Sequence, residues 1–166
     1  MAKSSVFADF ALAAFLLGAA WPAFAATTVI DAAYTETHQR LGCNCAPVTW
    51  TRRVHITLSG RNSVHEQWTQ TSSRNQSRSV EHDRELGKSA GRATWRVAGP
   101  NRLERTLNYP QHLTIMVITT RGDRCDLKVE YRLKPGFSDI LGKSALTHEW
   151  THFSLPQVTQ ESCQIR

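Results

Sequence analysis

A chain of 166 residues is long enough for one domain with a real hydrophobic core, and it is too short for several. Its 20 Lys and Arg residues outnumber its 14 Asp and Glu residues, so the formal net charge is +6 at pH 7. The basic residues alternate with apolar ones and do not gather in a block. This spacing favours a solvated sheet face over a nucleic-acid-binding tail.

The first 25 residues have the pattern of an export signal. Lys3 supplies a positive start, Phe10–Ala20 is an unbroken apolar run, and residues 23–25 read Ala-Phe-Ala, the form of a signal-peptidase site. We therefore predict a helical signal peptide over residues 1–25 and a secreted or periplasmic protein. An uncleaved N-terminal anchor is the alternative, because Asp9 is unusual beside the apolar run.

Export decides which partners a basic protein meets. Outside the cytoplasm these are envelope surfaces, anionic lipids and acidic glycans rather than nucleic acid. We expect binding to an anionic envelope component or a small ligand, and no nucleic acid. No segment after the signal is apolar enough for a membrane span, and the sequence leaves the oligomeric state open.

The chain from residue 26 to residue 91 gives uneven signals. Residues 26–49 are mixed, and we assign them only as an N-terminal segment that ends in a loop carrying two cysteines. Apolar and polar residues alternate over 50–59 and again over 64–70, with turn residues between them, which predicts a β-hairpin. Residues 71–91 are almost entirely polar, so we predict a long polar loop, within which one edge strand can form around Ser79–Leu86.

Alternation returns and continues to residue 134. Strands are predicted at 92–98, at 102–109 and at 112–120, the last apolar on both faces in its middle. The clearest strand is 125–134, where every second residue faces one side for ten residues. Its inward side chains are Cys125, Leu127, Val129, Tyr131 and Leu133.

These patterns predict a single all-β domain over residues 50–166. We expect an antiparallel meander of seven or eight strands around one core, curled into a barrel or packed as a sandwich. Four aromatic residues are candidates to line the interior of a barrel, or to serve as ordinary core. They are Trp50, Trp68, Trp95 and Tyr131.

Four cysteines in an exported chain predict two disulfides. We prefer Cys125 with Cys163, because both lie in strand-like segments and would join the C-terminal strand to the 125–134 strand. Cys43 would then close on Cys45 across one residue, an awkward ring, so the two crossed pairings stay open. A redox or metal role for this Cys-x-Cys pair is a lesser alternative, because the common motifs have two residues between the cysteines.

The run Arg-Leu-Lys-Pro-Gly-Phe at 132–137 follows an alternating strand that a cysteine opens, and another cysteine lies near the C-terminus. In these features the chain resembles small exported bacterial β-proteins of unknown function. The resemblance covers about a third of the chain. It implies export and a β fold, and it implies no reaction.

One short motif carries chemistry. His148, Glu149 and His152 match His-Glu-x-x-His, in which two histidines one helical turn apart bind zinc and the glutamate acts as general base. The same segment also alternates as a strand, in which the histidines would be ~13 Å apart. The Gly-x-x-His that continues the metzincin pattern is missing, because Leu155 stands in the place of the glycine and Val158 in the place of the histidine.

We therefore favour an exported, non-catalytic β-domain protein without a cofactor that binds an envelope component or a small ligand. The alternative is a small zinc-dependent hydrolase that uses His148 and His152 as metal ligands and Glu149 as the catalytic base.

Overall fold

The computed structural model describes residues 27–60, 62–143 and 149–166. The regular structure in these residues consists of β-strands. The strands are β1 (Thr27–His38), β2 (Val48–Ser59), β3 (Ser63–Ser72), β4 (Ser77–Glu85), β5 (Ser89–Ala90), β6 (Ala93–Gly99), β7 (Arg102–Asn108), β8 (His112–Arg121), β9 (Arg124–Leu133), β10 (Ile140–Lys143), β11 (Trp150–Phe153) and β12 (Gln157–Ile165). The predicted signal peptide lies outside the described residues, and no described helix is long and apolar enough to cross a bilayer.

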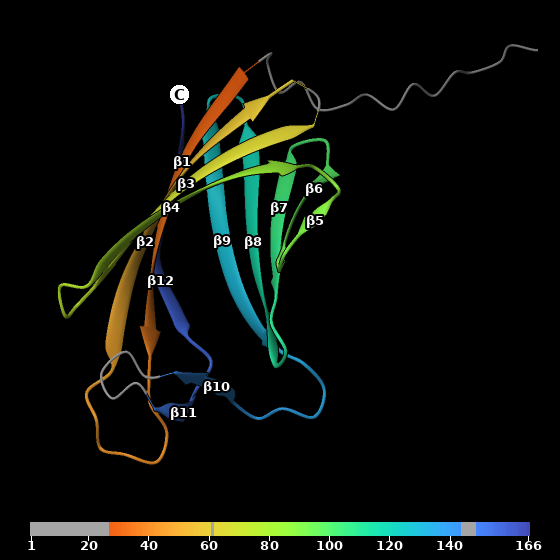
Figure 1. Ribbon diagram of the computed structural model, residues 1–166. Helices are drawn as coiled ribbons and strands as arrows, with labels where there is room; N and C mark the ends of the chain where they lie inside the picture. The colour runs from red at the N-terminus through yellow and green to blue at the C-terminus, as the bar shows by residue number, and fades with distance from the viewer. Residues whose placement is uncertain (1–26, 61, 144–148) are drawn as a thin grey trace, which may run out of the picture.

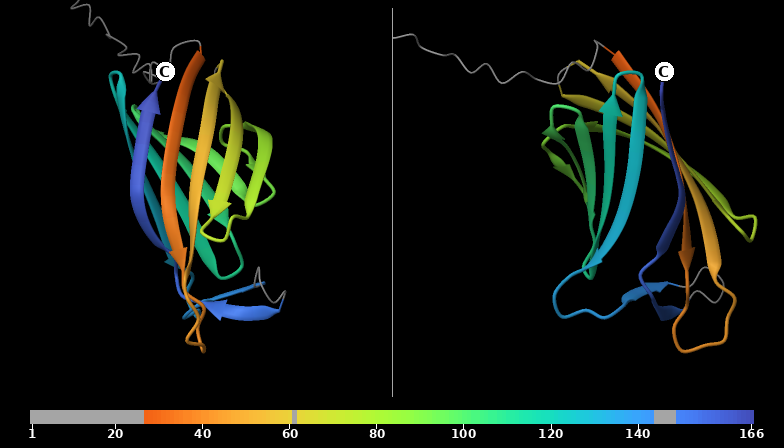
Figure 2. Two further views of the ribbon diagram at one scale, coloured as in Figure 1. Left: turned by 90° about the vertical axis from the view of Figure 1, so that its left-hand side faces the viewer. Right: turned by 180° about the vertical axis from the view of Figure 1, so that it is seen from behind.

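The strands form two five-stranded antiparallel sheets that face each other, with a separate β10–β11 pair (Figure 1). The first sheet has the order β12-β1-β2-β3-β4, and the second is the meander β5-β6-β7-β8-β9. Figure 2 shows that the sheets lie close together near the β8–β9 turn and diverge toward β10 and β11. The all-β prediction is confirmed, and the arrangement is a sandwich rather than a closed barrel.

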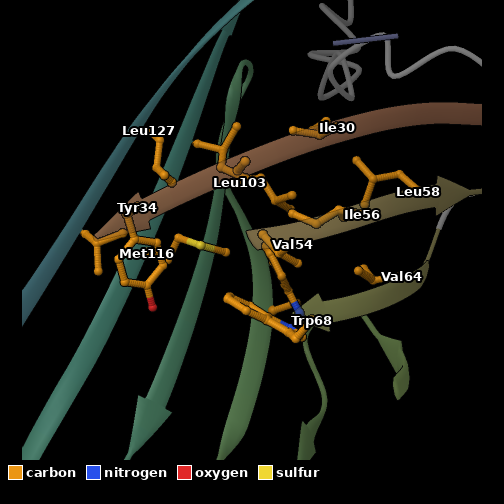
Figure 3. Packing of buried hydrophobic residues seen from close by; sticks show 14 residues of the cluster. Ile30, Tyr34, Val54, Ile56, Leu58, Val64, Trp68, Leu103, Met116 and Leu127 are labelled. Atoms are coloured by element: carbon orange, nitrogen blue, oxygen red, sulfur yellow. The ribbon is translucent and has the colours of Figure 1, made fainter. Parts of the chain in front are cut away.

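The core forms where the inward side chains of the two sheets meet (Figure 3). Because successive side chains of a strand point to opposite faces, each strand supplies every second residue to the interior. The largest aliphatic residues that are fully buried are Ile30, Ile56, Val64, Leu103 and Ile118, which come from both sheets. The alternation read from the sequence is therefore the physical basis of the fold.

Covalent and hydrogen bonds tie the edges of the two sheets together. A disulfide joins Cys125 in β9 to Cys163 in β12, which is the pairing that the sequence analysis preferred. At the opposite edge, the N–H of Gly87 donates to the carbonyl oxygen of Trp95 at 2.7 Å. Cys43 is joined to Cys45, the ring that looked awkward from the sequence.

Two expectations about the chain were wrong in part. Residues 71–91 are not one long polar loop, because their central nine residues form β4, an edge strand close to the one expected around Ser79–Leu86. The outer face of β4 is exposed to solvent and needs no apolar residues. Val80 is the main apolar side chain of β4 that packs against the core. Residues 27–38, left unassigned, form the long strand β1. Seven or eight strands were expected over residues 50–166, and the described residues from β2 onward form eleven.

Candidate functional site

A cavity of about 600 Å³ lies between the two sheets at the end where they diverge. Its walls come from both sheets, and β10 and β11 contribute Ile140, Gly142 and Phe153 at its mouth. The volume falls within the range of pockets that bind small organic molecules. The cavity is therefore the candidate site.

The interior changes character along its length. Near the β8–β9 turn the inward side chains are aliphatic, as Figure 3 shows for Ile30, Leu58 and Leu103. Toward the diverging end, the same faces of the same strands carry aromatic and charged side chains. The six aromatic side chains that line the cavity, apart from its histidines, are Tyr34, Trp50, Trp68, Tyr109, Tyr131 and Phe153.

The first buried charge cluster surrounds Glu36 of β1, whose side chain is 0% exposed. Arg52 of β2 donates to it through Nε at 2.6 Å, His38 lies 2.8 Å away through Nε2, and the Tyr131 hydroxyl donates from the opposite sheet. Burial raises the pKa of Glu36, but the hydrogen bond with His38 and the charge of Arg52 outweigh it, and the pKa falls from 4.5 to about 2. Glu36 is therefore a carboxylate at neutral pH.

The second cluster surrounds Glu66 of β3, which is also 0% exposed. Its Oε2 accepts hydrogen bonds from Nε1 of Trp68 at 2.8 Å, from Nε1 of Trp95 at 3.2 Å and from Nε of Arg105 at 2.8 Å, while Arg84 donates to Oε1. Burial raises the pKa of Glu66, but the charge of Arg105 and the hydrogen bonds from Arg84 and Trp68 lower it overall. The cluster joins four strands of the two sheets, β3, β4, β6 and β7, through one carboxylate.

Arg105 has a second role in the cavity wall. Its guanidinium carbon lies 4.6 Å from the centre of the Trp68 ring and 5.9 Å from that of the Trp95 ring. A guanidinium held by a carboxylate and stacked on indoles has a fixed orientation. The arrangement presents a preorganised cationic surface to the cavity.

The charge of the lining is one-sided. Eight Arg and Lys side chains line the cavity, and among the described residues no Asp or Glu does. Three of these cations pair with a buried glutamate behind the cavity surface. Arg52 pairs with Glu36, and Arg84 and Arg105 pair with Glu66. The other five are Arg40, Arg74, Arg78, Arg92 and Lys143, and none of them has a described carboxylate within salt-bridge distance.

A histidine without a hydrogen-bond partner lies in the same wall. His112 at the start of β8 is 8% exposed, and its Nδ1 has no partner among the described residues. The His112 ring stacks on the Tyr109 ring, with 4.6 Å between the ring centres. The guanidinium carbon of Arg92 lies 5.1 Å from the centre of the Tyr109 ring. Burial, and then the charges of His38 and Lys134, lower the pKa of His112. His112 is therefore a neutral ring in the cavity wall, with a buried Nδ1 that has no described partner.

The predicted zinc motif lies at the edge of this region. Glu149 is exposed and in a bend, Trp150–Phe153 is strand β11, and His148 lies outside the described residues. The Nδ1 of His152 is 2.7 Å from Oδ1 of Asp139. The helical form of the motif is thus absent from the β11 residues, and the described residues contain no cluster of three metal-binding side chains. The zinc-hydrolase alternative stays a prediction.

The four aromatic candidates divide between cavity and core. Trp50, Trp68 and Tyr131 line the cavity, while Trp95 is fully buried behind it and donates to Glu66. The two buried glutamates and their arginines were not among the residues predicted from the sequence. A signal for them existed, because Glu66 is in phase with the inward-facing Val64 and Trp68 of its strand.

No family model, curated protein or solved structure matches this chain. The fold and the cavity define it as a β-sandwich with an arginine-lined interior site.

Proposed function

We propose that the protein is an exported, non-catalytic binding protein whose cavity takes a small organic anion with an apolar body. The observation that carries the proposal is the lining, in which eight cations face the cavity and no described carboxylate does. A concave surface of one charge sign, set between low-dielectric walls, concentrates ions of the opposite charge. The lining therefore favours an anionic ligand.

The two buried glutamates do not cancel this preference. Each is saturated by donors within the protein, so it orients the guanidinium groups beside it and is not presented to a ligand. Arg74, Arg78 and Arg92, without such a partner, keep donors for a carboxylate, sulfate or phosphate group.

The walls also favour an apolar body on the ligand. Six aromatic side chains line the cavity, and aromatic faces bind apolar groups with large contact area and little loss of conformational freedom. Such a ligand would place its charge near the arginines and its body against Trp50, Tyr109 and Tyr131.

Two features support export and a non-catalytic role. Disulfides form and persist in oxidising compartments, and the structure pairs all four cysteines. Burial, and then the charge of Glu36, raise the pKa of both Tyr34 and Tyr131, so these hydroxyls stay protonated. The buried tyrosines and glutamates thus support the walls and are poor nucleophiles or bases.

The test compares two fluorescent probes that differ in charge alone, 11-(dansylamino)undecanoate and its methyl ester. We expect the anion to bind one site at least about tenfold more tightly than the ester, because a charge-assisted hydrogen bond contributes about 1.5–3 kcal/mol. Added salt should weaken the binding of the anion only.

Arg92→Ala is the decisive variant, because Arg92 lines the cavity without a described carboxylate partner, so its loss leaves no buried anion. It should weaken binding of the anion about tenfold and leave the ester unchanged. Arg53→Ala is the matched control, because Arg53 is on the outer face of β2, whereas its neighbour Arg52 lines the cavity. Equal affinity for the two probes, or equal effects of the two substitutions, would refute the proposal.

A further inference from the structure

The large apolar side chains that the described residues expose gather at one end of the molecule. Leu41, Phe137, Leu141 and Trp150 are each more than a third exposed, and Trp150 reaches 70%. They lie in the loop after β1, in the segment before β10, in β10 and in β11, which Figures 1 and 2 show together at the diverging end of the sheets. We call these four residues the apolar rim.

The segments that carry Leu41, Leu141 and Trp150 are bonded to one another, and Phe137 lies three residues before the start of β10. The N–H of Leu41 donates to the carbonyl oxygen of His152 at 2.8 Å, which holds the loop after β1 against β11. Strands β10 and β11 pair directly, with Leu141 opposite His152. The loop after β1 is therefore held beside the β10–β11 pair, about a hundred residues away in sequence.

The β10–β11 pair has two different faces. Ile140 is paired with Phe153 and Gly142 with Thr151, and Ile140, Gly142 and Phe153 line the cavity. The alternate residues lie on the opposite face of the pair and are exposed: Leu141, Lys143, Trp150 and His152. Lys143, at the end of β10, also borders the cavity. One face of the pair thus borders the cavity, while the other is exposed to solvent.

The composition of the outer face indicates the partner. Trp150 stands directly opposite Lys143, so an amphipathic ring lies beside a flexible cation. Tryptophan favours the headgroup level of a bilayer, where its ring meets apolar chains and its N–H meets water, and lysine there reaches anionic phosphate. Lys134 lies three residues before Phe137, and Asp139 is engaged by His152 at 2.7 Å. A net charge of +6 adds a general attraction to an anionic surface.

We propose that the apolar rim docks this end of the protein onto the surface of an anionic lipid bilayer. Trp150, Leu141 and Phe137 enter the interfacial region, and Lys143 contacts lipid phosphate. Docking goes beyond the proposed ligand binding and does not depend on it. It places the mouth of the cavity at the membrane, where amphipathic anions are concentrated.

Trp150 supplies the measurement, because the other three described tryptophans are buried or line the cavity. The protein is purified after export and mixed with vesicles of phosphatidylcholine, with or without about 30% phosphatidylglycerol. On anionic vesicles we expect retention in flotation, a blue shift of tryptophan fluorescence, and quenching by brominated lipid. Pure phosphatidylcholine should retain at least about tenfold less protein.

Trp150→Ala should weaken retention at least about fivefold and remove the brominated-lipid quenching, because the ring is the largest element of the rim. Val117→Ala, an apolar truncation on the outer face of β8, should leave both unchanged. Unaltered binding of the dansyl anion by Trp150→Ala separates docking from ligand binding. Equal retention of Trp150→Ala and the unsubstituted protein would overturn the proposal, as would self-association that shields Trp150 without lipid.

Discussion

Replacing Glu66 with glutamine tests whether the buried charge clusters organise the interior. The groups around the Glu66 carboxylate are all N–H donors, from Trp68, Arg84, Trp95 and Arg105. A carboxylate has acceptors only and satisfies every one of them. Glutamine has a single acceptor oxygen and places an NH₂ group against the remaining donors. It also leaves two buried guanidinium groups without a counter-charge.

Breaking a buried ion pair from one side costs about 3–5 kcal/mol. We expect Glu66→Gln to lower the free energy of unfolding by this amount, which moves the urea midpoint by about 2 M for a domain of this size. Glu81→Gln is the control, because Glu81 is exposed on the neighbouring β4, and it should change stability by less than about 0.5 kcal/mol. A loss below about 1 kcal/mol in Glu66→Gln would refute the reasoning.

Two further predictions concern acid and the disulfides. Since the pKa of Glu36 is lowered to about 2, its stabilisation is fully present above about pH 4.5 and is lost as the pH falls toward 2, about 3 kcal/mol in all. The difference between the free energies of unfolding at pH 7 and at pH 3 should be smaller in Glu36→Gln than in the unsubstituted protein. The same pH dependence in both proteins would contradict this prediction. Replacing Cys125 and Cys163 by serine opens a bridge with a sequence separation of 38 and should cost about 3–4 kcal/mol. Replacing Cys43 and Cys45, separated by 2, should cost clearly less, and equal losses would count against the loop-closure argument.

The alternation of inward and outward residues made the central strands predictable. The inward set of β9, from Leu127 to Tyr131, packs between the sheets as its period of two indicated. The β2–β3 hairpin followed from alternation on either side of Gly60, which has a φ of +61°. A local pattern of this kind is sufficient to predict a strand wherever one face of the sheet is buried and the other is exposed to solvent.

Other features depended on contacts distant in sequence. Strand β1 pairs with β12, more than a hundred residues away, and no local pattern shows which strand lies beside it. Strand β4 is polar because it is an edge, a position that the fold assigns and the sequence does not display. Glu36 broke the apolar alternation at an inward position, and its partner Tyr131 comes from the other sheet.

The most direct test of the account is to locate the anionic probe in its complex with the protein. Intermolecular nuclear Overhauser effects should connect the dansylundecanoate protons with the rings of Tyr109, His112 and Tyr131, which line the cavity between the sheets. Effects confined to outward residues of the sheets, such as Ile115 or Val117, would show that the anion binds elsewhere and would contradict the central claim.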